Sequence, residues 1–275
     1  MRRAIVGVLG GDDQHGQARA VGQMIVRNGW ILLTGGDGTS KAKKPQVKDT
    51  SMCGAASLNG PRIGILPDNT PLPSSATPRI AKWDQPSRAN YLFLKTGVSS
   101  KERNVINGQT PDILIAFSGG RGTLAEIAFA VAAKKPVLFV AGSVQKLEEK
   151  IDKHFGQRNP KRGQYLNDFF EKPLSLYPKA LGKGSGQTLL DQLSRKLKDS
   201  KEVNIEAIEK AIIYELRRGI GQQANFPGVP VGIGSRCKFE RGVKNISAQT
   251  RLVRSCQQAK VRSLRRPRAT IRGVG

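Results

Sequence analysis

The chain has 275 residues and a formal net charge of +25, because 46 Lys and Arg residues outnumber 21 Asp and Glu residues. A hydrophobic content of 38% excludes wholesale disorder, and no apolar run approaches the ~18 residues that a membrane-spanning helix needs. Three cysteines without a CxxC pair exclude a disulfide framework and predict a cytoplasmic protein without a metal site of Cys and His ligands.

Short β-branched runs alternate along the first part of the chain with segments of helical period. This alternation is typical of βαβ units, and it predicts an α/β protein with a Rossmann-like, doubly wound parallel sheet. Strands are predicted at 3–10, 30–34, 62–66 and 91–95, and helices at 17–28 and 50–58. The Pro-rich segment 67–86 is long for a loop, so we expect it to face a ligand or to be mobile.

The same alternation continues from residue 99 to residue 216. A helix at 99–107, with Ser99 or Ser100 as its N-cap, precedes a continuous apolar strand at 112–117 of the kind that is buried on both faces. Helices are further predicted at 124–133, 144–154, 187–197 and 205–216, and strands at 136–140 and 174–177.

Three segments are predicted from these patterns. Residues 1–182 form a Rossmann-like nucleotide-binding domain, residues 183–218 a helical extension, and residues 219–275 a basic, flexible tail. The stretch 220–275 has 12 basic residues and one acidic residue, so it accounts for much of the excess charge. Such a tail binds nucleic acid by releasing counterions, or it is a solvated extension without a partner, and the sequence leaves both readings open.

The most informative segment is the turn at 118–123, which joins the apolar strand to the next helix. Glycines at 119, 120 and 122 let backbone amides approach an anion, and a helix N-terminus adds a positive dipole end. In parallel sheets, ligands bind at the carboxyl ends of the strands, where this turn lies. Neither GxGxxG at the proper place nor GxxxxGK[ST] is present, so a dinucleotide or Walker-type site is disfavoured.

The run from Gly119 to Glu126 resembles the PGGxGTxxE motif of the LOG family, with Ser118 in place of the proline. It also resembles the molybdenum cofactor carrier proteins, which belong with LOG proteins to the SLOG superfamily. Upstream, the run from Lys101 to Asn104 is similar to the second motif of these proteins, and its Glu-Arg-Asn form looks more like the carrier branch. The segment 35–38 looks like their early Gly-rich loop, and the resemblance covers roughly residues 3–142.

The resemblance implies a pocket for a phosphorylated nucleotide or a nucleotide-like cofactor, such as a molybdopterin-type ligand, with no cofactor required. It assigns Arg103 and Glu126 to the ribose, where they are catalytic in members that cleave a nucleoside 5′-monophosphate at its N-glycosidic bond. It assigns the phosphate and nucleotide contacts to Gly35, Gly36, Gly119, Gly120, Arg121, Gly122 and Thr123. A homodimer or higher homo-oligomer, through small residues at 128–133, is also implied.

Each assignment has a plainer alternative. Arg103 and Glu126 are also consistent with a plain ion pair between neighbouring helices, and Arg121, at the tip of the turn, is equally consistent with a solvated side chain. Asp12 and His15 stand in the loop after the first strand, where ligand-facing residues and ordinary turn residues both occur. Three functions therefore remain: a carrier of a phosphorylated ligand, a phosphoribohydrolase, and a nucleic-acid-binding protein that uses residues 220–275. The Lys-rich insertion 41–48 either attracts phosphorylated ligands or is solvated.

Overall fold

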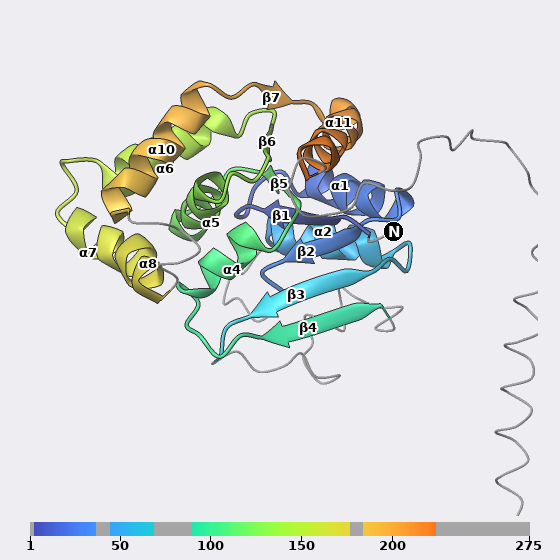
Figure 1. Cartoon of the computed structure of the whole chain (residues 1–275), viewed down its shortest axis with the longest axis horizontal. Helices are drawn as coiled ribbons and strands as arrows, with labels where there is room; N and C mark the ends of the chain where they lie inside the picture. Colours follow the sequence, from blue (N-terminus) through green and yellow to red (C-terminus); the bar gives the residue numbers. More distant parts are fainter. Residues whose placement is uncertain (1–2, 37–44, 69–89, 177–183, 224–275) are drawn as a thin grey trace, which may run out of the picture. The chain divides into compact units, whose positions relative to one another are not determined.

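The computed structural model describes residues 3–36, 45–68, 90–176 and 184–223 (Figure 1). These residues form a seven-stranded sheet in the order β4-β3-β2-β1-β5-β6-β7, and every neighbouring pair is parallel. The strands are β1 (Ile5–Leu9), β2 (Ile31–Thr34), β3 (Arg62–Leu66), β4 (Tyr91–Lys95), β5 (Ile113–Ala116), β6 (Val137–Val140) and β7 (Glu202–Val203). The predicted doubly wound, Rossmann-like sheet is confirmed.

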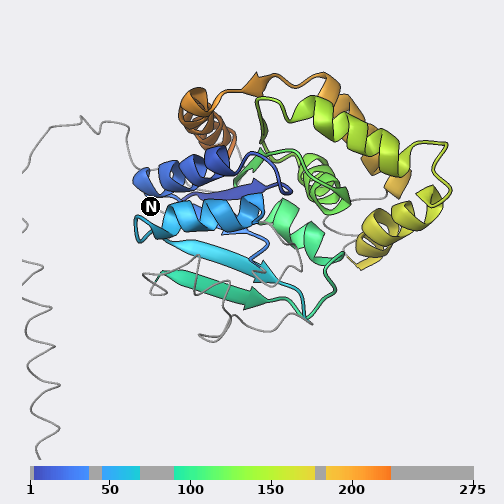
Figure 2. The same ribbon diagram turned by 180° about the vertical axis from the view of Figure 1, so that it is seen from behind.

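Helices cover both faces of the sheet (Figure 2). They are α1 (His15–Arg27), α2 (Val47–Ala56), α4 (Arg103–Gln109), α5 (Arg121–Ala132), α6 (Val144–Phe155), α7 (Arg162–Leu166), the π-helix η1 (Asn167–Glu171), α8 (Lys172–Leu176), α10 (Gly186–Lys198) and α11 (Ile205–Gln223). Helices α1, α2 and α11 pack together on one face, and α4, α5, α6 and α10 pack on the other. The two helices of the predicted extension, α10 and α11, thus lie on opposite faces.

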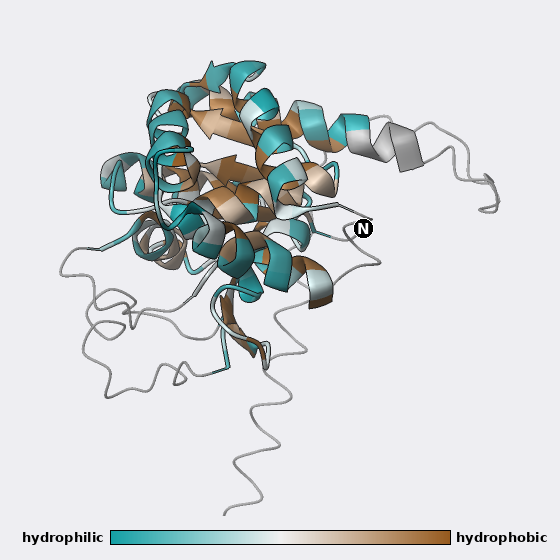
Figure 3. Cartoon of the chain, turned by 90° about the vertical axis from the view of Figure 1, so that its left-hand side faces the viewer, coloured by the Kyte–Doolittle hydropathy of each residue, from teal (hydrophilic) through white to brown (hydrophobic). Residues whose placement is uncertain are grey.

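The core consists of two apolar layers separated by the sheet. Along β5, Ile113 and Ile115 belong to the layer under α1 and α11, whereas Leu114 and Ala116 belong to the layer under α5 and α10. This alternation buries every residue of β5, as its continuous apolar sequence predicts. In Figure 3 the strands are mostly hydrophobic, while hydrophilic residues gather on the outer sides of the helices.

One predicted strand is wrong. The segment 174–177 was expected to be a strand, but residues up to Leu176 belong to the helix α8, and the last strand of the sheet is β7. The segment is helical because Phe170 and Leu174, which are four residues apart, are both buried in the layer that contains α5. A spacing of four residues puts them on the same side of a helix, whereas the apolar run 174–177 alone is too short to decide between helix and strand. The seventh strand instead pairs Val203 with Val140 of β6.

Five predicted helices, α1, α2, α4, α5 and α10, begin at other residues than predicted, and the shifts of α4 and α5 bear on the candidate site. Helix α5 begins at Arg121 and not at 124, so half of the Gly-rich turn is the first turn of the helix. Helix α4 begins at Arg103, because Ser99 and Glu102 form a separate turn in which Ser99 N donates to Glu102 Oε2 (2.8 Å). The Pro-rich segment from residue 69 onward, residues 41–44 of the insertion and the tail after residue 223 lie outside the described residues.

The order in which successive strands are added to the sheet reverses between β1 and β5. From β1 it proceeds outward through β2, β3 and β4, and it then returns to place β5 directly beside β1. In open parallel sheets such a reversal leaves a crevice at the carboxyl ends of the two central strands. The predicted turn at 118–123 follows β5 and therefore lies at this reversal point.

Candidate functional site

The loops after β1 and β5 contact each other through their backbones. Gly11 N donates a hydrogen bond to the carbonyl of Ser118 (2.8 Å). A Cβ atom added to Gly11 would lie 3.2 Å from the Cα of Gly119, which is tighter than most Cβ contacts. The two loop segments therefore approach each other closely. The two Gly-rich segments, which are far apart in the sequence, thus form one continuous backbone surface at the carboxyl edge.

The turn after β5 presents unpaired backbone N–H groups. Helix α5 has Gly120 as its N-cap without a side-chain cap, and its first backbone bond runs from Leu124 N to Gly120 O (3.0 Å). Among the described residues, no hydrogen-bond acceptor is found for the N–H groups of residues 120–123. Several donors and the positive end of the helix dipole therefore converge on one place, which is the chemistry that binds phosphate.

The three glycines of this turn have different roles. A Cβ at Gly119 would lie 2.3 Å from Thr123 Oγ1 and 2.6 Å from Thr123 Cβ, so glycine is required there for packing. A Cβ at Gly120 or Gly122 would meet no protein atom within 4 Å. These two glycines consequently keep free the space beside the unpaired N–H groups.

Arg103 is buried against the carboxyl ends of β2 and β3. Its side chain is only 8% exposed, and Nη1 donates to the carbonyls of Gly35 (2.9 Å) and Ile65 (3.2 Å). A Cβ at Gly35 would lie 3.3 Å from Arg103 Nη2, and Gly36 has a positive φ of 64° where its backbone crosses Gly64. The predicted residues Arg103, Gly35 and Gly36 are thus brought together, with the guanidinium held by carbonyl dipoles.

Glu126 lies one helical turn after Thr123 and is held by an asparagine on the neighbouring helix. Asn107 Nδ2 donates to Glu126 Oε1 (2.7 Å), and the two side chains are 0% and 8% exposed respectively. The other amide atom, Asn107 Oδ1, is buried and has no hydrogen-bond partner among the described residues. A buried acceptor without a donor normally marks a missing water or ligand group.

Asn107 is a site residue that the sequence analysis missed. It stands four residues after Arg103, on the same face of α4, and Gly108 beside it allows close packing because a Cβ there would lie 2.4 Å from the carbonyl of Glu126. A polar residue at helical spacing from the predicted arginine was the available signal.

Arg121 does not point freely into solvent. Its guanidinium carbon lies 4.1 Å from the ring centre of Tyr165 and 5.4 Å from that of Phe169, in α7 and η1. Such cation–π contacts restrict the side chain while leaving its N–H donors available. His154 packs edge-on against Tyr165, and burial together with the charge of Arg121 lowers the pKa of His154 below its ordinary value. Protonation of His154 would therefore add unfavourable positive charge beside Arg121.

A polar link joins the loops after β1, β5 and β6. The Asp13 carboxylate forms an ion pair with Lys146 of α6 and accepts a hydrogen bond from Ser118 Oγ (3.2 Å). The hydrogen bond from Lys146 holds the pKa of Asp13 below its usual value. Gln14, in a left-handed conformation with φ of 56°, donates from Nε2 to the carbonyl of Ala141 (2.8 Å). These contacts join the loops at the carboxyl ends of β1, β5 and β6, and Asp12, the candidate of the sequence analysis, is the exposed neighbour of Asp13.

Comparison with known families gives a match between residues 3–165 and the profile of the SLOG cluster4 family. The chain belongs to the SLOG cluster4 family. An uncharacterised protein of Archaeoglobus fulgidus is 31% identical over 152 residues, which cover 52% of this chain and 87% of that protein. The family assignment confirms the predicted relation to the SLOG superfamily.

Two solved structures are also similar to the chain. The molybdenum cofactor binding protein from Rippkaea orientalis is 31% identical, with 56% of this chain and 85% of that chain covered and a TM-score of 0.42. The molybdenum cofactor carrier protein from Chlamydomonas reinhardtii is 25% identical, with 72% and 100% covered and a TM-score of 0.38. The fold assignment rests on the strand order and not on these superpositions.

The described part of the chain has neither a metal site nor a membrane-spanning helix. No group of three or more His, Cys, Asp or Glu residues there is arranged to hold a metal ion. None of the helices in the described ranges is long and apolar enough to cross a membrane.

Proposed function

We propose that the protein binds a phosphorylated nucleotide, or a nucleotide-like cofactor, in the crevice between the loops that follow β1 and β5. The observation that carries the proposal is the first turn of α5, where the N–H groups of residues 120–123 have no acceptor among the described residues. The open space next to Gly120 and Gly122 supports it further, because an anion needs room to reach these donors.

The surrounding polar residues suit the rest of such a ligand. The Thr123 hydroxyl stands in the same first turn, and Arg121, restrained by Tyr165, offers a cation next to it. Further from the phosphate, the buried Glu126 carboxylate and the free Oδ1 of Asn107 are acceptors for ribose hydroxyls or for N–H groups of a ring. The Rippkaea orientalis protein is described as a molybdenum cofactor binding protein, and this cofactor is one ligand of the proposed class that should be tested.

Adding two methyl groups to the phosphate cradle is expected to weaken binding without unfolding the protein. In Gly120→Ala/Gly122→Ala the new Cβ atoms meet no protein atom within 4 Å, so the unfolding temperature should be retained. The affinity for AMP should fall by roughly 5- to 150-fold, because overfilling a packed site costs about 1–3 kcal/mol. Isothermal titration calorimetry of the full chain with AMP, and with other nucleoside 5′-monophosphates, measures the loss.

The matched control is Gly163→Ala/Gly184→Ala. Both of these glycines also have no atom within 4 Å of an added Cβ, and Gly163, like Gly122, is the second residue of a helix. This control should bind AMP as the unchanged protein does. Equal affinity of the two double variants would contradict the proposed position of the phosphate.

A second candidate function, a phosphoribohydrolase, is favoured by the buried and oriented carboxylate of Glu126. A carboxylate one turn beyond the phosphate cradle can stabilise an oxocarbenium-like centre or orient water for cleavage of the N-glycosidic bond. If the protein is such an enzyme, incubation with AMP should release adenine and ribose 5-phosphate, and Glu126→Gln should lower the rate by about 100-fold or more while AMP still binds. Chromatographic detection of adenine measures this.

The outcome separates the two functions. Release of adenine that disappears in Glu126→Gln would overturn a pure carrier function, whereas binding of AMP without any release of base would overturn the hydrolase. Homo-oligomer formation and nucleic-acid binding through residues 220–275 remain predictions from the sequence, and the tail after residue 223 lies outside the described residues.

A further inference from the structure

The segment formed by α7, η1 and α8 lies next to the Gly-rich turn at the carboxyl edge of the sheet. In Figure 1, helices α7 and α8 are on the side toward which the arrowheads of β3 and β4 point. Asp168 of η1 forms an ion pair with Lys101, in the turn before α4 (2.6 Å). The rings of Tyr165 and Phe169 contact the guanidinium of Arg121, in the first turn of α5. The segment therefore contacts the beginnings of both helices that contribute to the candidate site.

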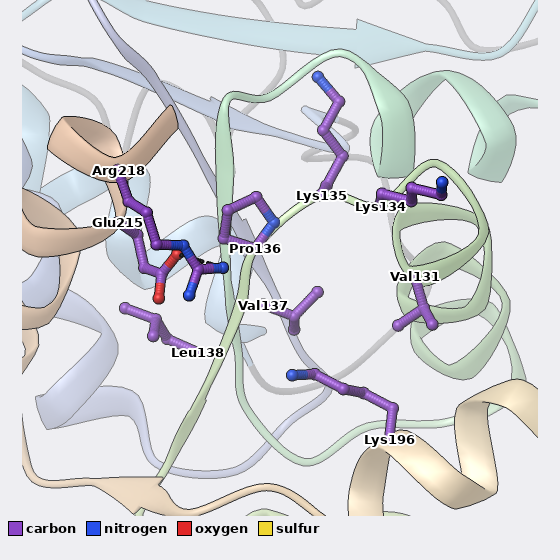
Figure 4. A pocket seen from close by; sticks show the side chains of 9 residues that line it. All are labelled: Val131, Lys134, Lys135, Pro136, Val137, Leu138, Lys196, Glu215 and Arg218. Atoms are coloured by element: carbon purple, nitrogen blue, oxygen red, sulfur yellow. Dashed lines mark ion pairs between the residues drawn. The ribbon is translucent and has the colours of Figure 1, made fainter. Parts of the chain in front are cut away.

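Arg121 is a half-buried cation without an anionic partner. Neither a carboxylate nor a hydrogen-bond acceptor is found for its guanidinium among the described residues. Other basic side chains have such a partner: Lys101 is paired with Asp168. In the pocket at the start of β6, Arg218 lies beside Glu215, with 3.3 Å between Nη2 and Oε2 (Figure 4). The N–H donors of Arg121 are thus available to a ligand.

The two rings determine where these donors lie. They belong to α7 and η1, so the guanidinium is directed toward that segment and away from the helix on which Arg121 stands. A guanidinium held on a ring keeps its planar set of N–H donors, which match two oxygens of one phosphate. The N–H groups of residues 120–123 already offer enough donors for another phosphate. The turn and the side chain together therefore offer two adjacent phosphate sites.

We propose that the ligand of this edge is a nucleoside diphosphate, with one phosphate on the N–H groups of residues 120–123 and the other on Arg121. This inference rests on the proposed function and specifies its ligand. The guanidinium binds the second phosphate through two N–H donors. Tyr165 is a positioning residue, because it acts on the ligand only through the side chain that lies on its ring.

AMP and ADP, which differ by one phosphate, test the inference. Calorimetric titration of the full chain at constant ionic strength should give an affinity for ADP at least about tenfold higher than that for AMP, because a charged, bidentate contact is added. Arg121→Gln should lower the ratio of the two affinities to less than about threefold, because both the charge and the planar donors are removed.

The matched control removes the same charge at the opposite edge of the sheet. Arg27 is exposed and lies in the last turn of α1, the helix that returns from the carboxyl end of β1 to the amino end of β2. Arg27→Gln should leave the ratio of the affinities for ADP and AMP unchanged, because a distant exposed charge is screened by salt.

Two substitutions of Tyr165 separate positioning from a purely structural role. Tyr165→Leu removes the ring beneath the guanidinium, so the ratio of the affinities for ADP and AMP should fall by about three- to fivefold. Tyr165→Phe keeps the ring and should keep the ratio. A structural role would weaken the binding of both nucleotides equally in Tyr165→Leu, and an unchanged ratio there would overturn the positioning role.

The titrations distinguish failure of this inference from failure of the proposed function. Equal affinities for AMP and ADP, or a tenfold ratio that persists in Arg121→Gln, would overturn the second phosphate site while the nucleotide site stands. If the chain binds neither nucleotide, the nucleotide site itself is wrong, and this inference is wrong with it.

Discussion

Alanine at Gly22 or at Gly54 is expected to lower the free energy of unfolding by about 3 kcal/mol, the upper end of the usual cost of overpacking. The two glycines are the contact points of α1 and α2. A Cβ at Gly22 would lie 2.0 Å from the carbonyl oxygen of Ser51, and a Cβ at Gly54 would lie 2.1 Å from that of Arg19. Since backbone atoms cannot rotate away as a side chain does, one helix must shift.

Urea unfolding, followed by circular dichroism, measures the effect as a lower midpoint. Gly16→Ala is the matched control, because Gly16 is also in α1 and has no atom within 4 Å of an added Cβ. In the control the loss of backbone freedom in the unfolded chain should leave stability unchanged or raise it by about 0.5–1 kcal/mol. Equal midpoints for Gly16→Ala and Gly22→Ala would show that the helices do not pack this closely.

The consequence of this packing reaches the candidate site. Val47 N, at the start of α2, donates to the carbonyl of Gly11 in the loop after β1 (2.7 Å). A displaced α2 would therefore move the loop after β1, which borders the proposed site. We expect Gly22→Ala to lower the affinity for AMP as well as the free energy of unfolding.

Replacement of Arg103 by methionine is expected to cost about 3 kcal/mol of stability and also to abolish the stabilisation by AMP. The guanidinium is the donor for two buried carbonyls, those of Gly35 and Ile65. Methionine fills a similar volume but leaves both acceptors without this donor, and each such loss costs about 1–3 kcal/mol. The positive charge that the family resemblance places beside the ribose of the ligand is removed at the same time.

Thermal unfolding with and without AMP separates the two roles. The lower unfolding temperature without AMP reports the structural role, and the missing upward shift with AMP reports the binding role. Arg195→Met is the control: this arginine also donates to one carbonyl, that of Asp191 (3.4 Å), but it is exposed, so its loss should cost less than about 0.5 kcal/mol. A retained AMP shift in Arg103→Met would restrict Arg103 to a structural role.

Much of the fold follows from local patterns in the sequence. Six of the seven strands were predicted because β-branched runs and helical periods alternate, and these signals extend over only a few residues. The strand β7 was missed, since two residues, Glu202 and Val203, are too short to give a periodic signal. The segment 174–177 was predicted as a strand, but its residues up to Leu176 are helical, and Leu174 is buried in the same layer as Phe170, one helical turn earlier.

For the candidate site, the sequence by itself determined the Gly-rich turn that our proposal uses as the phosphate cradle. Gly119, Gly120 and Gly122 lie between a buried strand and a helix, and that local order already implies unpaired N–H groups at the carboxyl edge. The match of residues 3–165 to the SLOG cluster4 family agrees with the family resemblance of this segment.

Only the tertiary structure decided which residues surround the cradle. Arg103 meets the carbonyl of Gly35 across 68 positions of sequence, and Asn107 meets Glu126 across 19. Arg121 is held by Tyr165 and Phe169, from helices that the sequence analysis did not predict. Contacts of this kind depend on strand order and helix packing, which bring distant segments together, and no periodicity within one segment specifies its neighbour.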